Sequence, residues 1–261
     1  MPLTALIGTL LQLAAAVPAT PSSTALPAIG AGSAVQPAFG VYSGRQRQTD
    51  VRMPPASSAT VEIDGKLDEP VWATAPLLTG FSLYQPADNR PAPDSTDVRV
   101  WYSPTALYLG IRAYETHSPV RATLADRDRV SSDDNIEIQL DTFEERRRAY
   151  VFIVNPLGVQ ADGTKSDGGG FIPGSNVAPG QNDLSADFQW QSRGHVTDFG
   201  YEVELRIPFS SVRFPSTDLQ RWGIQIVRHV QHSGYEQTWT PALRASASFI
   251  PQGADPGREA L

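Results

Sequence analysis

Short segments in which apolar and polar residues alternate are the feature that most constrains how this chain can fold. The segment 96–104, TDVRVWYSP, and the segment 106–115, ALYLGIRAYE, both place aliphatic side chains on one face and polar or aromatic side chains on the other. A period of two is that of a β-strand, whereas a helix repeats every 3.6 residues. Because Ser103-Pro104 is typical of a turn, the two segments are predicted to form a β-hairpin.

The same pattern continues through the rest of the chain. Further short apolar segments, separated by turns that contain Gly or Pro, have the sequences DNIEIQLDT, AYVFIVNPLG, GYEVELRIPF, RWGIQIVRHV and EQTWTP. Hardly any helical period is present. We therefore predict an all-β fold, an antiparallel and jelly-roll-like β-sandwich over residues 60–245 with one short helix near its start.

The stretch 63–75, IDGKLDEPVWATA, brings three carboxylates and a Trp close together. Asp68 is predicted to cap the short helix, and the Glu and Pro that follow it suit a first helical turn. Leu67 and Trp72 then have the spacing of a hydrophobic staple. A catalytic carboxylate pair needs a defined separation across a substrate, which neighbouring sequence positions do not provide. We therefore interpret the stretch as structural.

The two ends of the chain differ in composition from the predicted domain. Residues 1–25 begin with an apolar run too short to cross a bilayer and continue into small residues, which is typical of a signal peptide. No basic residue precedes the run, so a disordered Ala-rich leader is the alternative. Residues 26–59 are predicted to be a Pro/Ala/Ser-rich linker and residues 246–261 an irregular tail. We expect export to the periplasm, the outer membrane or the extracellular space, without a transmembrane helix.

Net charge and residue usage exclude several classes of function. The formal net charge is −7 with a sequence pI near 5.1, which disfavours a nucleic-acid-binding surface. The chain has no Cys, which excludes disulfides, thiolate metal sites and a Cys nucleophile. No H-E-x-x-H or G-x-S-x-G motif occurs. We therefore predict no catalytic residue in this chain.

Several of these segments together resemble the family-9 carbohydrate-binding-module-like domain, in the form found at the N-terminus of exported bacterial proteins. The resemblance rests on IDGKLDEPVW, VRVWYSPTALYLGIRAYE, DDNIEIQLDTFEERRRAYVFIVNPLGVQADG, GYEVELRIPFSSVRF and WGIQIVRHV, and it covers about residues 60–242. It implies a sugar-binding β-sandwich with structural calcium ions, attached to a glycoside hydrolase or to a large C-terminal β-rich region. Related chains would continue where this one ends, so we expect a truncated tail. Relative to them the Gly-rich segment 162–183 is an insertion.

Sugar recognition needs flat aromatic rings and planar polar groups. The predicted strand registers place such side chains on one open sheet face, namely Arg99, Trp101, Tyr108, Arg112, Tyr114, Glu137 and Gln139. The predicted carbohydrate-binding residues are Trp101, Tyr108, Arg99, Arg112, Glu137 and Trp190. Trp101 is the first candidate, and Trp190, which also fits a core position, is the last. An ordinary solvated face, or one covered by the insertion or by another domain, is the alternative.

Two acidic segments contain oxygen ligands of the kind that Ca²⁺ prefers. The segment DRDRVSSDD contributes Asp126, Asp128, Asp133 and Asp134, and the Gly-rich insertion contributes Asp162, Asp167, Asn182 and Asp183. Neither follows the spacing of an EF-hand loop. A structural calcium ion is therefore expected from the resemblance, with solvated turns as the alternative, and its ligands stay unassigned.

The sequence thus predicts a non-catalytic carbohydrate-binding domain of an exported protein, with a glycan or oligosaccharide as its partner and a role in carbohydrate catabolism. One alternative is the accessory part of a glycoside hydrolase that acts on O-glycosyl bonds. Another is a structural or interaction module with a decayed sugar site and an outer-membrane or cell-surface partner. A haem-binding variant of the same sandwich is a more distant alternative.

Overall fold

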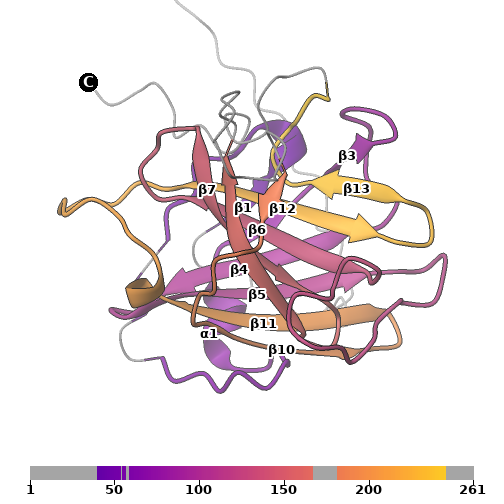
Figure 1. Ribbon diagram of the computed structural model, residues 1–261, viewed down its shortest axis with the longest axis horizontal. Helices are drawn as coiled ribbons and strands as arrows, with labels where there is room; N and C mark the ends of the chain where they lie inside the picture. Colours follow the sequence, from indigo (N-terminus) through magenta and orange to yellow (C-terminus); the bar gives the residue numbers. More distant parts are fainter. Residues whose placement is uncertain (1–39, 54, 57–58, 167–180, 245–261) are drawn as a thin grey trace, which may run out of the picture. The chain divides into compact units, whose positions relative to one another are not determined.

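The computed structural model describes residues 40–53, 55–56, 59–166 and 181–244, which form two facing β-sheets (Figure 1). In this part of the chain, the first sheet consists in spatial order of β1 (Val41–Ser43), β2 (Leu77–Thr79), β4 (Thr96–Tyr102), β5 (Ala106–Tyr114), β11 (Gly200–Pro208) and β10 (Gln191–Val196). The second consists of β3 (Ser82–Gln85), β13 (Tyr235–Thr238), β12 (Gly223–Val230), β6 (Asn135–Asp141), β7 (Arg148–Val154), β8 (Gln160–Ser166) and β9 (Asn182–Asp183). The predicted all-β sandwich is confirmed.

Other elements are short. A helix, α1 (Pro70–Thr74), precedes β2, and 3-10 turns occupy η1 (Gly44–Gln46) and η2 (Phe209–Ser211). β1 lies inside the segment predicted to be a linker and pairs in parallel with β2. The sequence did not indicate this strand, because three residues are too few to display an alternation. None of the described helices is long and apolar enough to span a lipid bilayer.

The hydrophobic core lies between the two sheets and consists of the apolar residues that the alternation points to. Its fully buried members include Val98, Leu109, Ile111, Val203, Leu205, Ile136, Ile138, Phe152 and Ile226. The β4–β5 hairpin pairs Val100 with Leu109 as the pattern predicts. Its turn is held by Ser103, whose hydroxyl accepts hydrogen bonds from the backbone N–H groups of Thr105 and Ala106. Burying each large aliphatic side chain contributes about 1.5–3 kcal/mol.

The stretch around α1 packs on the outer face of the first sheet. α1 begins at Pro70 with Glu69 as its N-cap residue, and no side chain caps it, so the predicted Asp68 cap is wrong. Leu67 and Trp72 are both buried in a second apolar cluster, but with Glu69 as the N-cap they stand at N″ and N3, one position before those of the predicted hydrophobic staple. Gly110 on β5 makes room for them, since a Cβ atom there would lie 2.6 Å from Leu67 Cδ2. The structural interpretation of this stretch is confirmed.

A buried carboxylate on β11 fixes the stretch around α1, which covers the outer face of the first sheet, to that sheet. We call this stretch, residues 63–75, the cover. Glu204 Oε2 accepts hydrogen bonds from the backbone N–H groups of Asp64 at 2.9 Å and Gly65 at 2.8 Å. Glu204 Oε1 accepts one from Trp72 Nε1 at 3.0 Å. Gly65 adopts φ +93° at a point where its Cβ would lie 3.0 Å from the backbone nitrogen of Gly194. Only glycine combines that conformation with so close an approach.

The pKa of Glu204 is raised to about 7. Burial is the largest cause, and the nearby Glu69 carboxylate adds to it, whereas the N–H donors of Gly65, Asp64 and Trp72 act in the opposite direction. The folded protein therefore keeps a proton on this group in a range where an unfolded chain has released it.

Replacing Trp101 by Ala is expected to destabilise the fold by about 3–5 kcal/mol, because the ring is buried beneath α1 and its loss leaves a large cavity. Chemical denaturation followed by circular dichroism measures this change. Leu219→Ala, at a site 72% exposed, serves as the control and should change stability by less than about 0.5 kcal/mol. Similar losses for both variants would contradict the packing described.

The free energy of unfolding of the natural chain should fall as pH rises from about 4.5 through about 7, because Glu204 has its pKa raised in the folded state. Glu204→Gln cannot ionise and should lose this part of the pH dependence. Denaturation curves of both proteins across this range give the free energy of unfolding at each pH. Because all other titrating groups are the same in the two proteins, the difference between the two profiles belongs to Glu204. Parallel pH profiles would show that the carboxyl titrates normally.

Candidate functional site

The predicted open aromatic face is closed in the structure. Trp101 is 1% exposed and Tyr108 9% exposed, and their rings stack on each other at a centroid distance of 3.9 Å. Trp72 contacts Trp101 edge-on, with 6.0 Å between the ring centroids, and so also covers this face. The expectation that these two rings form an open platform is therefore wrong, because strand alternation identifies a shared face but not the segment that covers it.

The two arginines of the predicted site also hold the cover in place. Arg112 donates to the Glu202 carboxylate and, through Nη2, to the backbone oxygen of Leu67 at 3.4 Å. Arg99 donates through Nη1 to the backbone oxygen of Ala75 at 3.4 Å. Their guanidinium groups thus contact the polypeptide segment that closes this face.

The remaining predicted residues lie elsewhere. Trp190 packs in the main core, and its Nε1 donates to Asp162 at 3.2 Å, in keeping with the core interpretation. Tyr114 is half-buried against Phe199. Glu137 and Gln139 lie on β6 in the second sheet, so the expectation that they share a face with Trp101 is wrong. The alternation is correct along each strand but does not say which sheet a strand joins.

A polar cluster gathers on the outer face of the second sheet, around Glu137. We call it the Glu137 cluster, and it consists of Glu137, Gln139, Lys165, Asn182, His229 and Glu236. Glu137 Oε1 accepts a hydrogen bond from Gln139 Nε2 at 2.7 Å, and Glu137 Oε2 accepts one from Asn182 Nδ2 at 2.9 Å. The carboxylate is thus the centre on which the other side chains converge.

The contact between Asn182 and Glu137 shows that this face is concave. The two residues lie on β9 and β6, which are separated in the sheet by β7 and β8. In a flat sheet three strand spacings amount to about 14 Å, which these two side chains cannot bridge. A 2.9 Å hydrogen bond between them therefore requires the sheet to curl inward around the cluster. The curl makes a cradle for the polar groups.

Charged neighbours surround the central carboxylate. Lys165 Nζ lies 3.6 Å from Glu137 Oε1, and His229 Nε2 lies 3.7 Å from Glu137 Oε2. The other ring nitrogen of His229 lies 3.8 Å from Glu236 Oε1. The imidazole on β12 thus bridges the carboxylates of its two neighbouring strands, β6 and β13. The side chains of His229 and Glu236 are 25% and 29% exposed, so solvent reaches the cluster from the β12–β13 side.

The pKa values in the cluster follow from this arrangement. Burial by itself would raise the pKa of Glu137, but the ion pair with His229, the charge of Lys165 and the hydrogen bond from Gln139 lower it to about 2. Burial would lower the pKa of His229, but the Glu137 and Glu236 carboxylates outweigh it and raise the pKa above its usual value. At neutral pH Glu137 is therefore a fixed hydrogen-bond acceptor.

Some acceptors in this cradle have no hydrogen-bond donor among the described residues. Gln139 Oε1 and Asn182 Oδ1 are buried without a partner. So is Thr238 Oγ1, which lies in the same cross-strand row as Val227 and Glu137 and so faces the same side. Unsatisfied buried polar atoms are rare because each costs about 1–3 kcal/mol. The outer face of the second sheet thus carries three buried acceptors that lack a donor among the described residues.

Several carboxylates proposed as calcium ligands accept hydrogen bonds from N–H groups. Asp134 accepts from the backbone nitrogens of Arg121 and Gln231, and Asp133 accepts from Thr123 and Asn155. Asp162 accepts from Arg127, Phe188 and Trp190. Asp126 and Asp128 are exposed, Asn182 donates to Glu137, Asp183 accepts from Ser185, and Asp167 lies outside the described residues. Calcium binding at these positions stays a prediction.

Sequence reasoning missed His229 and Lys165 as partners of Glu137, and Glu236 as the second partner of His229. One signal was available, since Ser233-Gly234 is a turn that would pair His229 with Glu236 in a tight hairpin, as β12 and β13 do. Nothing comparable indicated Lys165, because its proximity depends on the curl of the sheet.

Comparisons with known proteins give one family. A family model described as Carbohydrate family 9 binding domain-like matches residues 63–240. No curated protein matches the sequence.

Several solved structures are similar to this chain, among them the following three. One is a carbohydrate binding module family 9 from Caldicellulosiruptor kristjanssonii in complex with cellotriose, with 17% identity, TM-score 0.48, and coverage of 72% of this chain and 84% of that one. A second, from the same organism in complex with glucose, has 15% identity, TM-score 0.48, and coverage of 77% and 93%. A protein from Bacteroides uniformis has 15% identity, TM-score 0.47, and coverage of 66% and 82%.

The ring of His229 should titrate with a midpoint above 6.5, because its charged form is stabilised by Glu137 and Glu236. The stability that this pairing contributes is present below pH 6.5 and is lost as pH rises through the folded-state pKa. NMR titration of the histidine rings measures the midpoint, and the signal missing in His229→Gln assigns it. Glu137→Gln should lower the midpoint, and an unchanged value would contradict the pairing.

Proposed function

The chain belongs to the carbohydrate family 9 binding domain-like family, and we propose on this basis that it binds a glycan or oligosaccharide at the Glu137 cluster without catalysing a reaction. The observation that carries the proposal is the concave cradle with acceptors that lack donors. Sugars present many hydroxyl groups, each of which can donate one hydrogen bond. Gln139 Oε1 and Asn182 Oδ1 would accept from them, beside the charged acceptor Glu137.

An aromatic residue also lies on the strand next to that of Glu236. Tyr84 is half-buried on β3, which pairs with β13, the strand of Glu236. Burial and, after it, the charge of Glu236 raise the pKa of Tyr84. A tyrosine ring offers a flat apolar face for the C–H groups of a pyranose and a polar tip for its hydroxyls. Recognition would then depend more on hydrogen bonds than on stacking between two rings.

The charge state of the cluster argues against hydrolysis there. A glycosidase needs a carboxylic acid whose pKa is raised so that it can protonate the leaving oxygen. Glu137 has a pKa of about 2, so it is ionised throughout the physiological range. This supports a binding role rather than a catalytic one for the Glu137 cluster, whether or not a glycoside hydrolase is attached to the chain.

A second candidate function is that of an interaction module whose sugar site has decayed. The observation that favours it is the burial of Trp101 and Tyr108, which removes the stacking platform that the sequence indicated. Such a module would use an outer-membrane or cell-surface protein as its partner. It predicts no affinity for sugars at the Glu137 cluster.

We also propose that the protein is exported and acts in carbohydrate catabolism outside the cytoplasm. The support is the apolar N-terminal run followed by small residues, within residues 1–25. Fractionation of cells that express the full chain, with N-terminal sequencing of the product, tests this. An uncleaved protein in the cytoplasm would contradict it.

A glycan array, run with and without calcium, should identify bound glycans, and isothermal titration should then give their affinity for the full chain. Glu137→Gln is expected to weaken binding by about 10- to 100-fold, because the variant loses a charged acceptor. Glu236→Gln should weaken it less and leave stability nearly unchanged, since this side chain is partly exposed.

The matched control is Glu144→Gln, which changes an exposed glutamate between β6 and β7 and should leave affinity unchanged. Denaturation curves of each variant exclude unfolding as the cause of lost binding. Absence of binding to any arrayed glycan, or equal affinities for Glu236→Gln, Glu137→Gln and the natural chain, would refute the proposed site and favour the interaction module.

A further inference from the structure

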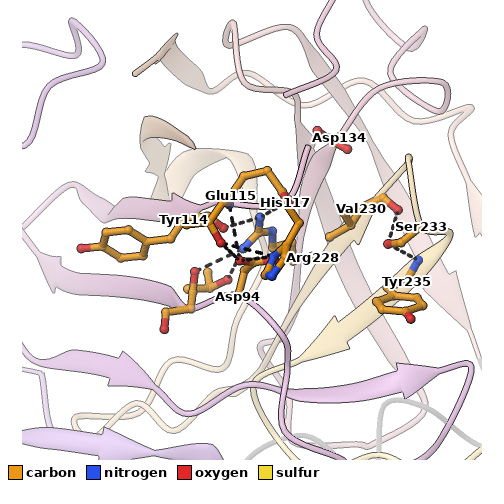
Figure 2. Close-up of polar contacts among 12 residues, drawn as sticks. Asp94, Tyr114, Glu115, His117, Asp134, Arg228, Val230, Ser233 and Tyr235 are labelled. Atoms are coloured by element: carbon orange, nitrogen blue, oxygen red, sulfur yellow. Dashed lines mark hydrogen bonds and ion pairs between the residues drawn. The ribbon is translucent and has the colours of Figure 1, made fainter. Parts of the chain in front are cut away.

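Three potential metal ligands meet at the end of the sandwich where β4 begins and β5 ends. Asp94 lies two residues before β4, and Glu115 and His117 follow β5 directly. The two strands are antiparallel neighbours, with Thr96 paired to Ala113, so these two segments lie side by side. Figure 2 shows Asp94, Glu115 and His117 gathered around the end of the Arg228 side chain.

The donor atoms are close enough to share one ion. One ligand atom from each residue lies within 4.8 Å of the other two, and no other group of three His, Cys, Asp or Glu residues in the described part of the chain meets this condition. His117 Nδ1 lies 3.0 Å from each Asp94 oxygen. Ligands bound at about 2.0–2.2 Å around a tetrahedral ion lie only a little farther apart than that.

A shell of hydrogen bonds already orients the two carboxylates. Thr116 donates through its hydroxyl to Asp94 Oδ1 at 2.9 Å. Arg228 Nη2 donates to Glu115 Oε2 at 3.1 Å. The other carboxylate oxygen, Glu115 Oε1, faces His117 and accepts a hydrogen bond from its backbone N–H at 3.3 Å. Outer contacts of this kind fix ligand orientation in metal sites.

Arg228 is itself held firmly, so its charge is part of the site. It is 1% exposed and donates to the backbone oxygens of Ser95 and Tyr114, which belong to the same two segments. Its positive charge offsets one of the two carboxylates, and the other leaves a net negative charge for a cation. An ion at this position would tie the two segments together.

We propose that Asp94, Glu115 and His117 bind one divalent transition-metal ion of the zinc class. Two carboxylate oxygens with an imidazole nitrogen suit such an ion, whereas Ca²⁺ takes oxygen ligands. The His117 side chain is 61% exposed, so a further coordination position faces solvent. This site is separate from the Glu137 cluster and does not depend on the proposed carbohydrate binding.

Titration of the tag-free, metal-stripped full chain with Zn²⁺ in a calorimeter should give one ion per chain. Co²⁺ used in its place should develop the visible absorption of a four- or five-coordinate site. Asp94→Asn and His117→Gln should each weaken Zn²⁺ binding at least tenfold. The control His232→Gln, which changes an exposed histidine in the β12–β13 turn, should bind as the natural chain does.

Circular dichroism of the metal-free variants establishes that they are folded, so that weaker binding reflects the ligands. Absence of saturable Zn²⁺ or Co²⁺ binding would overturn the proposal and leave the cluster a loop anchor. Unchanged affinity in Asp94→Asn and His117→Gln would overturn it as well, as would tighter binding of Ca²⁺ that His117→Gln does not affect. Glycan affinity is measured separately, so either proposal can fail alone.

Discussion

The buried Glu204 carboxylate is the interaction on which the arrangement of this protein's surfaces depends. It accepts hydrogen bonds from the backbone of Asp64 and Gly65 and from Trp72, and so fixes the segment before β2 to the outer face of the first sheet. The cover takes this carboxyl group out of water, and the three donors satisfy both of its oxygens, so that its burial is not left unpaired. One sheet face is therefore closed, and the second sheet carries the candidate binding site.

The second sheet curls, and the curl creates a site that no single strand contains. Glu137, Lys165, Asn182 and His229 come from four strands, and their side chains meet because β9 folds back toward β6. The resulting concentration of charge lowers the pKa of Glu137 and raises that of His229. These shifts coincide on one sheet face with buried acceptors that lack donors among the described residues.

Strand β12 supports both proposed sites through consecutive residues. Arg228 points inward and orients Glu115 at the end of the sandwich, whereas His229 points outward and bridges Glu137 and Glu236. The period-two geometry of a strand places neighbours on opposite faces, so a single strand can serve two independent sites. The same geometry keeps the Asp94, Glu115 and His117 cluster apart from the Glu137 cluster.

The sequence by itself determined the sandwich, the β4–β5 hairpin and the structural role of the stretch around α1, because alternation and turn residues act within a few positions of each other. It also indicated Glu137 and Gln139 as outward-facing residues of β6. Only the tertiary structure decided that Trp101 and Tyr108 are sealed and that Glu137 meets Lys165 and Asn182. Burial and charge clustering depend on which strands become neighbours and which segment covers a face, and those contacts join residues far apart in the chain.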